Sequence, residues 1–141
     1  IESDLQLIFK LIKKHQPCLI YYFATPKILF KIVKDKKIIQ TYNNYFIKFP
    51  LQIIKYAQRH NSNFFYPSTT YSNNLSLYSK IKSKAEKEIN KLKNDKIKIS
   101  VAKIPGINTK QSLSLIHKKL PNFRDLMSKD SEIFNKVFFK Y

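Results

Sequence analysis

Residues 64–102 read FFYPSTTYSNNLSLYSKIKSKAEKEINKLKNDKIKISVA, and this stretch decides the fold. Its first residues are apolar and aromatic, which predicts a short strand over 63–67 that ends near Ser68. Residues 78–94 then place apolar side chains at three- and four-residue steps, which predicts a helix. Residues 97–102 alternate apolar and polar side chains, which predicts another strand. A strand, a helix and a second strand in this order are typical of a crossover between two parallel strands.

The same arrangement continues toward the N-terminus. A continuous apolar run over 18–24 is typical of a strand buried on both faces of a parallel sheet. The segment 38–60 has apolar side chains at helical spacing, and we expect Pro50 to kink or divide this helix. The sequence therefore predicts an α/β fold. The strands 18–24, 63–67 and 97–102 are expected to be adjacent and parallel, with helices on both faces of the sheet.

The two ends of the chain add further elements. Ser3 is a candidate N-cap for a first helix, which Pro17 ends. Pro121 is typical of the first position of a helix, which we expect to reach about Ser128. The pattern over 134–139 fits either a strand or a helix. In open α/β sheets ligands bind beyond the carboxyl ends of the strands, so the residues that follow each strand are the place to look for chemistry.

The composition excludes several classes of protein. The chain has 141 residues, 43% of them hydrophobic, which suits one domain with its own core rather than a disordered chain. It has one glycine, Gly106, and one cysteine, Cys18, so these residues contain no glycine-rich phosphate loop, disulfide or cysteine zinc cluster. Cys18 is expected to be a small core residue. Three histidines are far apart in the sequence and show no metal-ligand spacing, so we expect no metal: His15, His60 and His117.

The ends and the apolar runs of the chain give two further expectations. No run of about 18 apolar residues is present, so no helix is expected to span a membrane and no membrane partner is expected. The chain begins at Ile1 without a Met or a signal-peptide pattern, and we expect it to be a segment of a longer protein.

The charge leaves two function classes open. A net charge of +18 normally suggests binding to a polyanion. However, the cations are almost all Lys, spread along the chain, and base readout favours Arg, of which only Arg59 and Arg124 occur. Lys, Ile and Asn, which AT-rich codons encode, are all abundant here. We therefore expect no specific nucleic-acid partner, and keep a Lys-rich nucleic-acid-binding α/β module as the alternative function.

One face of the helix 78–94 carries an unusual pair. At 100° per residue, Tyr78 and Lys82 fall within the same apolar arc of about 100° as Ala85 and Ile89. Most other lysines of this helix lie on the opposite side. Lys82 could extend its ammonium to water along the apolar surface. Alternatively, Tyr78 and Lys82 could face a cleft as a functional pair. The geometry of the helix alone leaves both interpretations open.

The residues around this pair resemble a known family. Tyr78 and Lys82, followed by Ala85-Glu86, resemble the Tyr-x-x-x-Lys helix of the short-chain dehydrogenase/reductase superfamily, in its extended, sugar-nucleotide-modifying branch. Four other stretches resemble that family in the same order: Ile20 to Pro26 its fourth strand, Tyr42-Asn43-Asn44 the start of the next helix, Phe64 to Thr70 its fifth strand and Val101 to Asn108 its sixth. The resemblance covers about residues 1–110.

The resemblance implies a fold, an activity and a cofactor. The fold is a Rossmann-like parallel sheet with flanking helices. Residues 1–141 would form a single partial NAD(P)-binding domain, in which 110–141 begin the substrate-binding region. The full-length protein would be a cytoplasmic NAD- or NADP-dependent epimerase, dehydratase or reductase that acts on a nucleotide-activated sugar and can form a homodimer. A non-catalytic member of the same fold, used for binding, is a further alternative.

The resemblance also implies roles for particular residues. Tyr78 would be the acid/base, with a pKa lowered by the ammonium of Lys82 and by the nicotinamide cation. A hydroxyl from Thr69, or otherwise Ser68, would bond the reacting oxygen. Cofactor contacts would come from Ala24, Thr25, Asn44, Tyr78, Lys82, Pro105, Gly106 and Ile107. Substrate contacts would come from Thr70 and Asn108. The sequence departs from the family at Lys103, where Arg is frequent, and at Thr109-Lys110, where Tyr-Gly is frequent.

Overall fold

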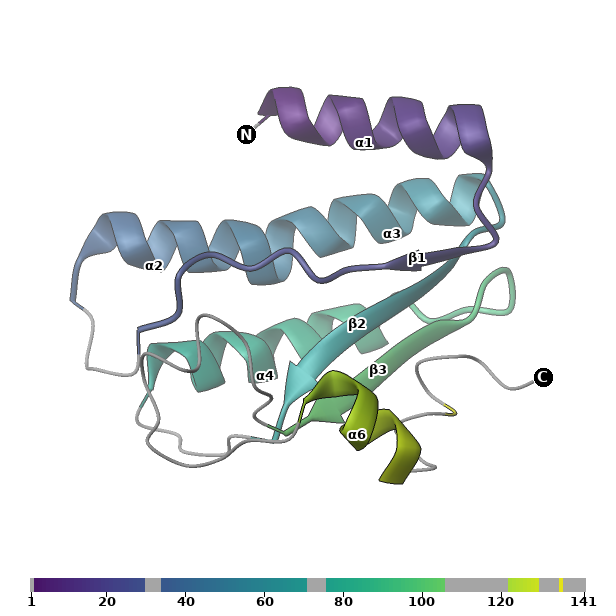
Figure 1. The fold of residues 1–141 in the computed structure, drawn as a ribbon. Helices are drawn as coiled ribbons and strands as arrows, with labels where there is room; N and C mark the ends of the chain where they lie inside the picture. The colour runs from purple at the N-terminus through teal and green to yellow at the C-terminus, as the bar shows by residue number, and fades with distance from the viewer. Residues whose placement is uncertain (1, 30–33, 71–75, 106–121, 130–134, 136–141) are drawn as a thin grey trace.

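A parallel three-stranded sheet forms the centre of the fold (Figure 1). The computed structural model describes residues 2–29, 34–70, 76–105, 122–129 and 135. The strands are β1 (Leu19–Tyr21), β2 (Asn63–Thr69) and β3 (Ile99–Ile104), in the spatial order β1-β2-β3. Both strand pairs are parallel, with Leu19 opposite Asn63 and Phe64 opposite Ile99. The predicted adjacency and direction of the three strands are confirmed.

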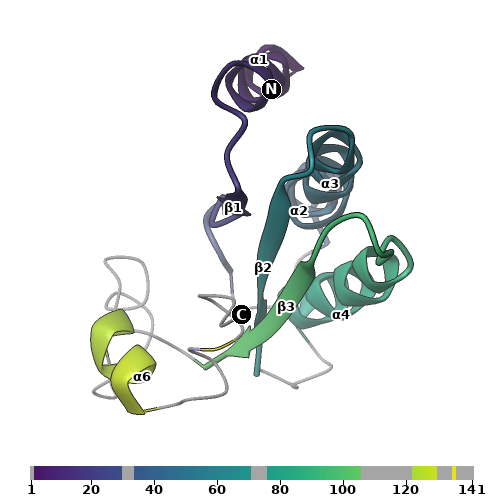
Figure 2. The same ribbon diagram turned by 90° about the vertical axis from the view of Figure 1, so that its right-hand side faces the viewer.

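Helices connect the strands as the periodicity predicts. Between β1 and β2 run α2 (Lys36–Asn43), the π-helical turn η1 (Asn44–Lys48) and α3 (Phe49–Arg59), and α4 (Leu77–Asn90) connects β2 to β3. The connecting helices lie on one side of the sheet, and α6 (Phe123–Lys129) lies on the other (Figure 2). The helix α1 (Glu2–His15) packs against α3. The α/β class is thus confirmed, with a parallel sheet flanked by helices.

The helix between β1 and β2 shows how the chain accommodates Pro50. The predicted division is confirmed, because a π-helical turn separates α2 from α3 and Pro50 lies in the first turn of α3. Pro50 has no N–H, so the carbonyl of Phe46 lacks its α-helical donor, and the Phe49 N–H bonds Asn44 instead of Tyr45. The hydroxyls of two buried tyrosines take the place of these donors. Tyr66 donates to the Phe46 oxygen at 3.0 Å, and Tyr22 donates to the Tyr45 oxygen at 2.5 Å.

The core lies between the sheet and the helices on its covered side. Phe64 and Tyr66 of β2 are fully buried, as are Ile54 and Ala57 of α3. Ala85 of α4 is fully buried as well, and its small side chain permits close packing of α4 within the core. Burial of this extent is the main favourable contribution to folding.

The length and the burial of β1 differ from the prediction. The expected strand over 18–24 is only three residues long, and its burial on both faces is wrong. Tyr22 points into the core, whereas Tyr21 is 40% exposed and Phe23 is 50% exposed, both beside the Phe65 ring. Cys18 is exposed, which corrects its expected place in the core. The reason is that β1 is an edge strand of the described sheet, and its outer face is covered by no described helix.

The ends of the helices follow local signals with one exception. The helix α1 ends at His15, where Gln16 adopts a positive φ of 41° and Pro17 follows. Ser3 lies inside this helix, because α1 begins at Glu2, so the predicted N-cap is wrong. At the other end, Asn122 Oδ1 accepts a bond from the Asp125 N–H at 2.8 Å and caps α6. Residues 113–121 and 134–139, apart from Asn135, lie outside the described residues. No helix in the described ranges is long and apolar enough to cross a membrane.

Candidate active site

The first turns of α4 bring the predicted pair to the end of β2. Ser76 caps the helix, since its Oγ accepts a bond from the Ser79 N–H at 3.1 Å. The helix is continuous from Leu77 to Asn90, four residues shorter at its end than the prediction over 78–94. Tyr78 lies in the first turn and Lys82 one turn later, so both side chains lie on the same side of the helix.

Tyr78 contacts the residue that the resemblance singles out. Its phenol forms a side-chain hydrogen bond with Thr69, the last residue of β2. Its ring also meets Phe46 edge-on, with ring centroids 5.4 Å apart. Burial raises the pKa of Tyr78, and the Thr69 hydrogen bond opposes this effect. In the chain by itself the phenol is therefore protonated at neutral pH, and the direction of its pKa shift is opposite to the lowering that the resemblance implies.

Lys82 is buried, and its ammonium is held beneath aromatic rings. Its side chain is 5% exposed, which excludes the interpretation that the ammonium extends to water. The Nζ atom donates to the Pro67 carbonyl oxygen at 2.5 Å. It also lies 4.3 Å from the centre of the Tyr66 ring and 4.8 Å from that of Phe46, which are cation–π distances.

The environment of Lys82 makes its charge sensitive to pH. Burial lowers the pKa of Lys82 to about 7, while the negative charge of Glu86 acts in the opposite direction. An ammonium on an unfolded chain has a pKa near 10.4. Between these values the unfolded state binds the proton and the folded state releases it. The free energy of unfolding must therefore rise with pH in this window and stay flat below it, where both states are protonated.

This sign gives a prediction for stability. We expect the free energy of unfolding of the wild-type chain to rise by about 2 kcal/mol more between pH 7 and pH 9 than that of Lys82→Met. Urea unfolding at both pH values measures the difference, and the comparison of two variants cancels the other titrating groups. Lys80→Met, an exposed position on the same helix, should behave like the wild type. Equal pH dependence in wild type and Lys82→Met would show that the ammonium is not buried in solution.

The two candidate hydroxyls at the end of β2 have different partners. Thr69 bonds Tyr78, whereas Ser68 is 4% exposed and donates to the carboxylate of Glu86. Side chains alternate along a strand, so Ser68 points toward the same side as Tyr66, under the helices. Of the two, Thr69 is the hydroxyl that the structure brings to Tyr78.

The remaining predicted residues make local contacts. Ala24 and Thr25 follow β1, and the Thr25 hydroxyl donates to the Pro26 oxygen at 3.1 Å. Asn44 lies in η1 and accepts a bond from Gln40 at 3.1 Å. The Thr70 N–H donates to the Ile104 oxygen at 3.3 Å, and its side chain is exposed. Pro105 follows β3 directly, while three of the predicted contacts lie outside the described residues: Gly106, Ile107 and Asn108.

Sequence reasoning missed three contributors to this site. Phe46 and Tyr66 supply the rings around the ammonium, and Glu86 bonds the end of β2. Glu86 had a signal in the sequence, since it stands four residues after Lys82 and therefore on the same side of the helix. Phe46 and Tyr66 had no such signal in the sequence, because their approach to Lys82 depends on how the helix and the sheet pack.

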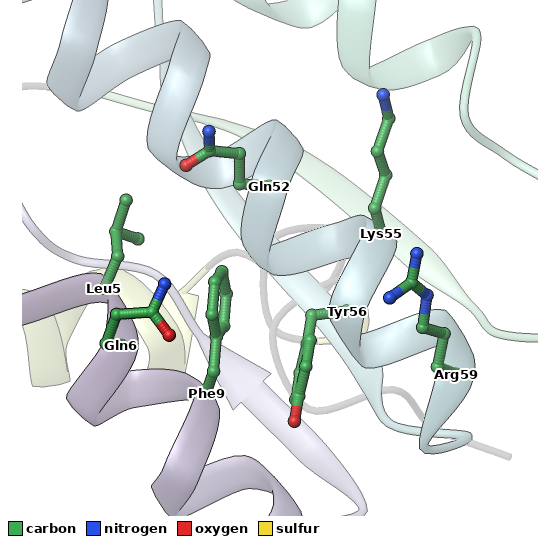
Figure 3. Close-up of a pocket in the computed structure, with 7 residues that line it drawn as sticks. All are labelled: Leu5, Gln6, Phe9, Gln52, Lys55, Tyr56 and Arg59. Carbon is green, nitrogen blue, oxygen red and sulfur yellow. The ribbon is translucent and has the colours of Figure 1, made fainter. Parts of the chain in front are cut away.

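A separate groove lies between α1 and α3 (Figure 3). Its volume is about 620 Å³, and it is lined by Leu5, Gln6, Phe9, Gln52, Lys55, Tyr56 and Arg59. The rings of Phe9 and Tyr56 stack across it, with centroids 4.5 Å apart. None of these residues belongs to the cluster at the end of β2. The groove is therefore a feature independent of Tyr78 and Lys82.

Comparison with known proteins adds no assignment. No protein-family model matches the chain, and no curated protein is significantly similar to it in sequence. The family resemblance consequently rests on the residues quoted above.

Proposed function

We propose that the chain is part of an NAD(P)-dependent enzyme of the extended short-chain dehydrogenase/reductase type, with a Rossmann-like fold, acting on a nucleotide-activated sugar. One observation carries the proposal. Thr69, Tyr78 and Lys82 meet at the carboxyl end of the central strand of a parallel sheet, where ligands of such sheets bind. The Tyr-x-x-x-Lys spacing and the strand before it have the order that the family resemblance requires.

The donors of the cluster suit the nicotinamide ribose of NAD(P). An ammonium has three N–H donors, and Lys82 uses one of them on the Pro67 oxygen. The others would bond ribose hydroxyls, together with the phenol of Tyr78, once the bound cofactor uncovers Lys82, which is 5% exposed in the chain by itself. The bound cofactor would supply or accept the hydride. The chain has one glycine, so these 141 residues hold no glycine-rich turn for the pyrophosphate.

The chain's own residues would handle the proton. Tyr78, protonated at neutral pH, can donate its proton to a substrate oxygen and later recover it. The Thr69 hydroxyl, already bonded to Tyr78, can hold the same oxygen in line. In its charged form, Lys82 would favour the phenolate that forms while the proton is away. The burial of Lys82 and the partial burial of Tyr78 strengthen this electrostatic effect, since less water screens it.

Cofactor binding tests the proposal. The full-length protein with Lys82→Met is expected to bind NAD⁺ or NADP⁺ roughly 10- to 100-fold more weakly than the wild type, because hydrogen bonds from a charged donor are lost. Isothermal calorimetry measures the change. Lys80→Met, exposed on the same helix, is the matched control and should bind normally. A wild-type protein that binds neither dinucleotide, or a Lys82→Met protein that binds as well as wild type, would contradict the proposal.

Nucleic-acid binding is the second candidate, favoured by the groove between α1 and α3. Lys55 and Arg59 stand beside the stacked rings of Phe9 and Tyr56, and cations next to aromatic rings are typical of sites for single strands. Two basic side chains make few phosphate contacts, so such binding should be weak and sensitive to salt. Tight binding of a nucleic acid at physiological salt, without dinucleotide binding, would favour this candidate over the enzyme.

A further inference from the structure

Three hydrogen bonds join one side of α4 to three consecutive residues of β2. The helix residues are four apart, at 78, 82 and 86, and so lie along one stripe. Tyr78 bonds Thr69, the Lys82 ammonium bonds the Pro67 oxygen, and the Glu86 carboxylate accepts the Ser68 hydroxyl. The mechanism above uses the first two bonds. It gives no role to the third.

Glu86 is also the charged group that acts on the buried ammonium. Its carboxylate lies one turn beyond Lys82 on the same stripe and favours the charged form of the lysine. The sequence has no other acidic residue between Asp35 and Glu86. Glu88, the other acid of α4, pairs with Lys91 at 2.8 Å and projects elsewhere on the helix.

The described residues of the neighbouring elements offer Lys82 no second negative charge at neutral pH. Among the described residues packed around α4, Tyr42 comes from α2 and Tyr66 from β2, while Tyr78 belongs to α4 itself. Burial raises the pKa of all three phenols, so they are neutral at pH 7. The nearest ring from η1 is that of Phe46, which carries no charge.

We propose that Glu86 is a positioning residue of the candidate active site, which fixes the end of β2 through Ser68 and balances the buried ammonium of Lys82. The hydrogen bond with Ser68 holds the Glu86 carboxylate at the end of β2, on the same stripe of α4 as Lys82. The same bond anchors the residue before Thr69, and so the hydroxyl that meets Tyr78. The inference deepens the proposed function and rests on it for the role of Lys82. Its test reads the lysine directly and needs neither cofactor nor turnover.

The test is an NMR titration of the chain with ¹³C-labelled lysine. The Lys82 signal is assigned by its loss in Lys82→Met, and its Cε shift is followed from pH 5 to pH 10. Glu86→Gln keeps an acceptor for Ser68 but removes the charge, so the Lys82 titration should move to lower pH by roughly one unit. Glu88→Gln removes a charge from the same helix and should leave the titration in place.

Ser68→Ala provides the second arm, and it removes the anchor without touching either charged group. It should move the Lys82 titration in the same direction as Glu86→Gln by a smaller amount. It should also hasten the exchange of the backbone N–H groups at positions 68 and 69. If the Glu86→Gln variant does not fold, the Ser68→Ala result decides whether the proposal holds. A Lys82 titration unchanged in Glu86→Gln, or equally shifted in Glu88→Gln, would overturn the proposal. So would a Ser68→Ala chain with both the lysine titration and the strand exchange of the wild type.

Discussion

Turnover of the full-length protein is expected to fall by roughly 10²- to 10⁴-fold when Tyr78 is replaced by Phe, the usual contribution of general acid–base catalysis. The substitution removes one oxygen and keeps the ring, so the edge contact with Phe46 remains. Only the hydrogen bond with Thr69 is lost, and stability should fall by no more than about 1 kcal/mol. The measurement is steady-state hydride transfer with a nucleotide sugar, beside the thermal midpoint of unfolding.

The matched control for this experiment is Tyr56→Phe. Tyr56 lies in the groove between α1 and α3, and its replacement also removes a single phenol oxygen. Turnover and cofactor affinity should remain those of the wild type. If Tyr78→Phe also kept wild-type turnover, Tyr78 would not be the acid/base. The non-catalytic alternative would gain support if the wild-type protein bound the dinucleotide but transferred no hydride.

The sequence predicts the strands and the connecting helices because their signals are local. Apolar runs and alternation locate β2 and β3, and three- and four-residue steps locate α3 and α4. The shared side of Tyr78 and Lys82 likewise follows from helix geometry alone. These patterns do not show which face of a strand or helix is covered by another element. The exposure of Cys18, Tyr21 and Phe23 on β1 could not be predicted for this reason.

The direction of the Lys82 side chain was equally beyond local reasoning. The ammonium of Lys82 lies against Phe46, in the turn just before Pro50, and against Tyr66 of β2. Pro50 is accompanied by a π-helical turn, and the carbonyl of Phe46 in that turn accepts the hydroxyl of Tyr66. This bond joins the Tyr66 side chain to the backbone of Phe46, and the ammonium lies against the rings of both residues. A contact between three segments that are far apart in the sequence produces no periodic pattern of residues, so it cannot be predicted from such a pattern.

This arrangement makes Phe46 a side chain whose loss should strongly destabilise the chain. Phe46 is 1% exposed, and its ring contacts those of Tyr42 and Tyr78 and the ammonium of Lys82. Phe46→Ala removes a buried aromatic ring and opens a cavity, for which we expect a loss of about 3–5 kcal/mol in the free energy of unfolding. Urea unfolding followed by far-UV circular dichroism measures this loss at a fixed pH.

Two further variants make the result specific to the position of the ring. Phe23→Ala removes the same side chain where it is 50% exposed, and should cost no more than about 1 kcal/mol. Phe46→Leu keeps most of the bulk but no ring, so it should cost about 1.5 kcal/mol and remain folded at pH 7. In that variant the ammonium loses one of its two cation–π contacts, and the Lys82 titration should move to lower pH. Equal losses at positions 23 and 46 would show that η1 does not pack on β2 in solution, and the buried setting of Lys82 would then have no structural basis.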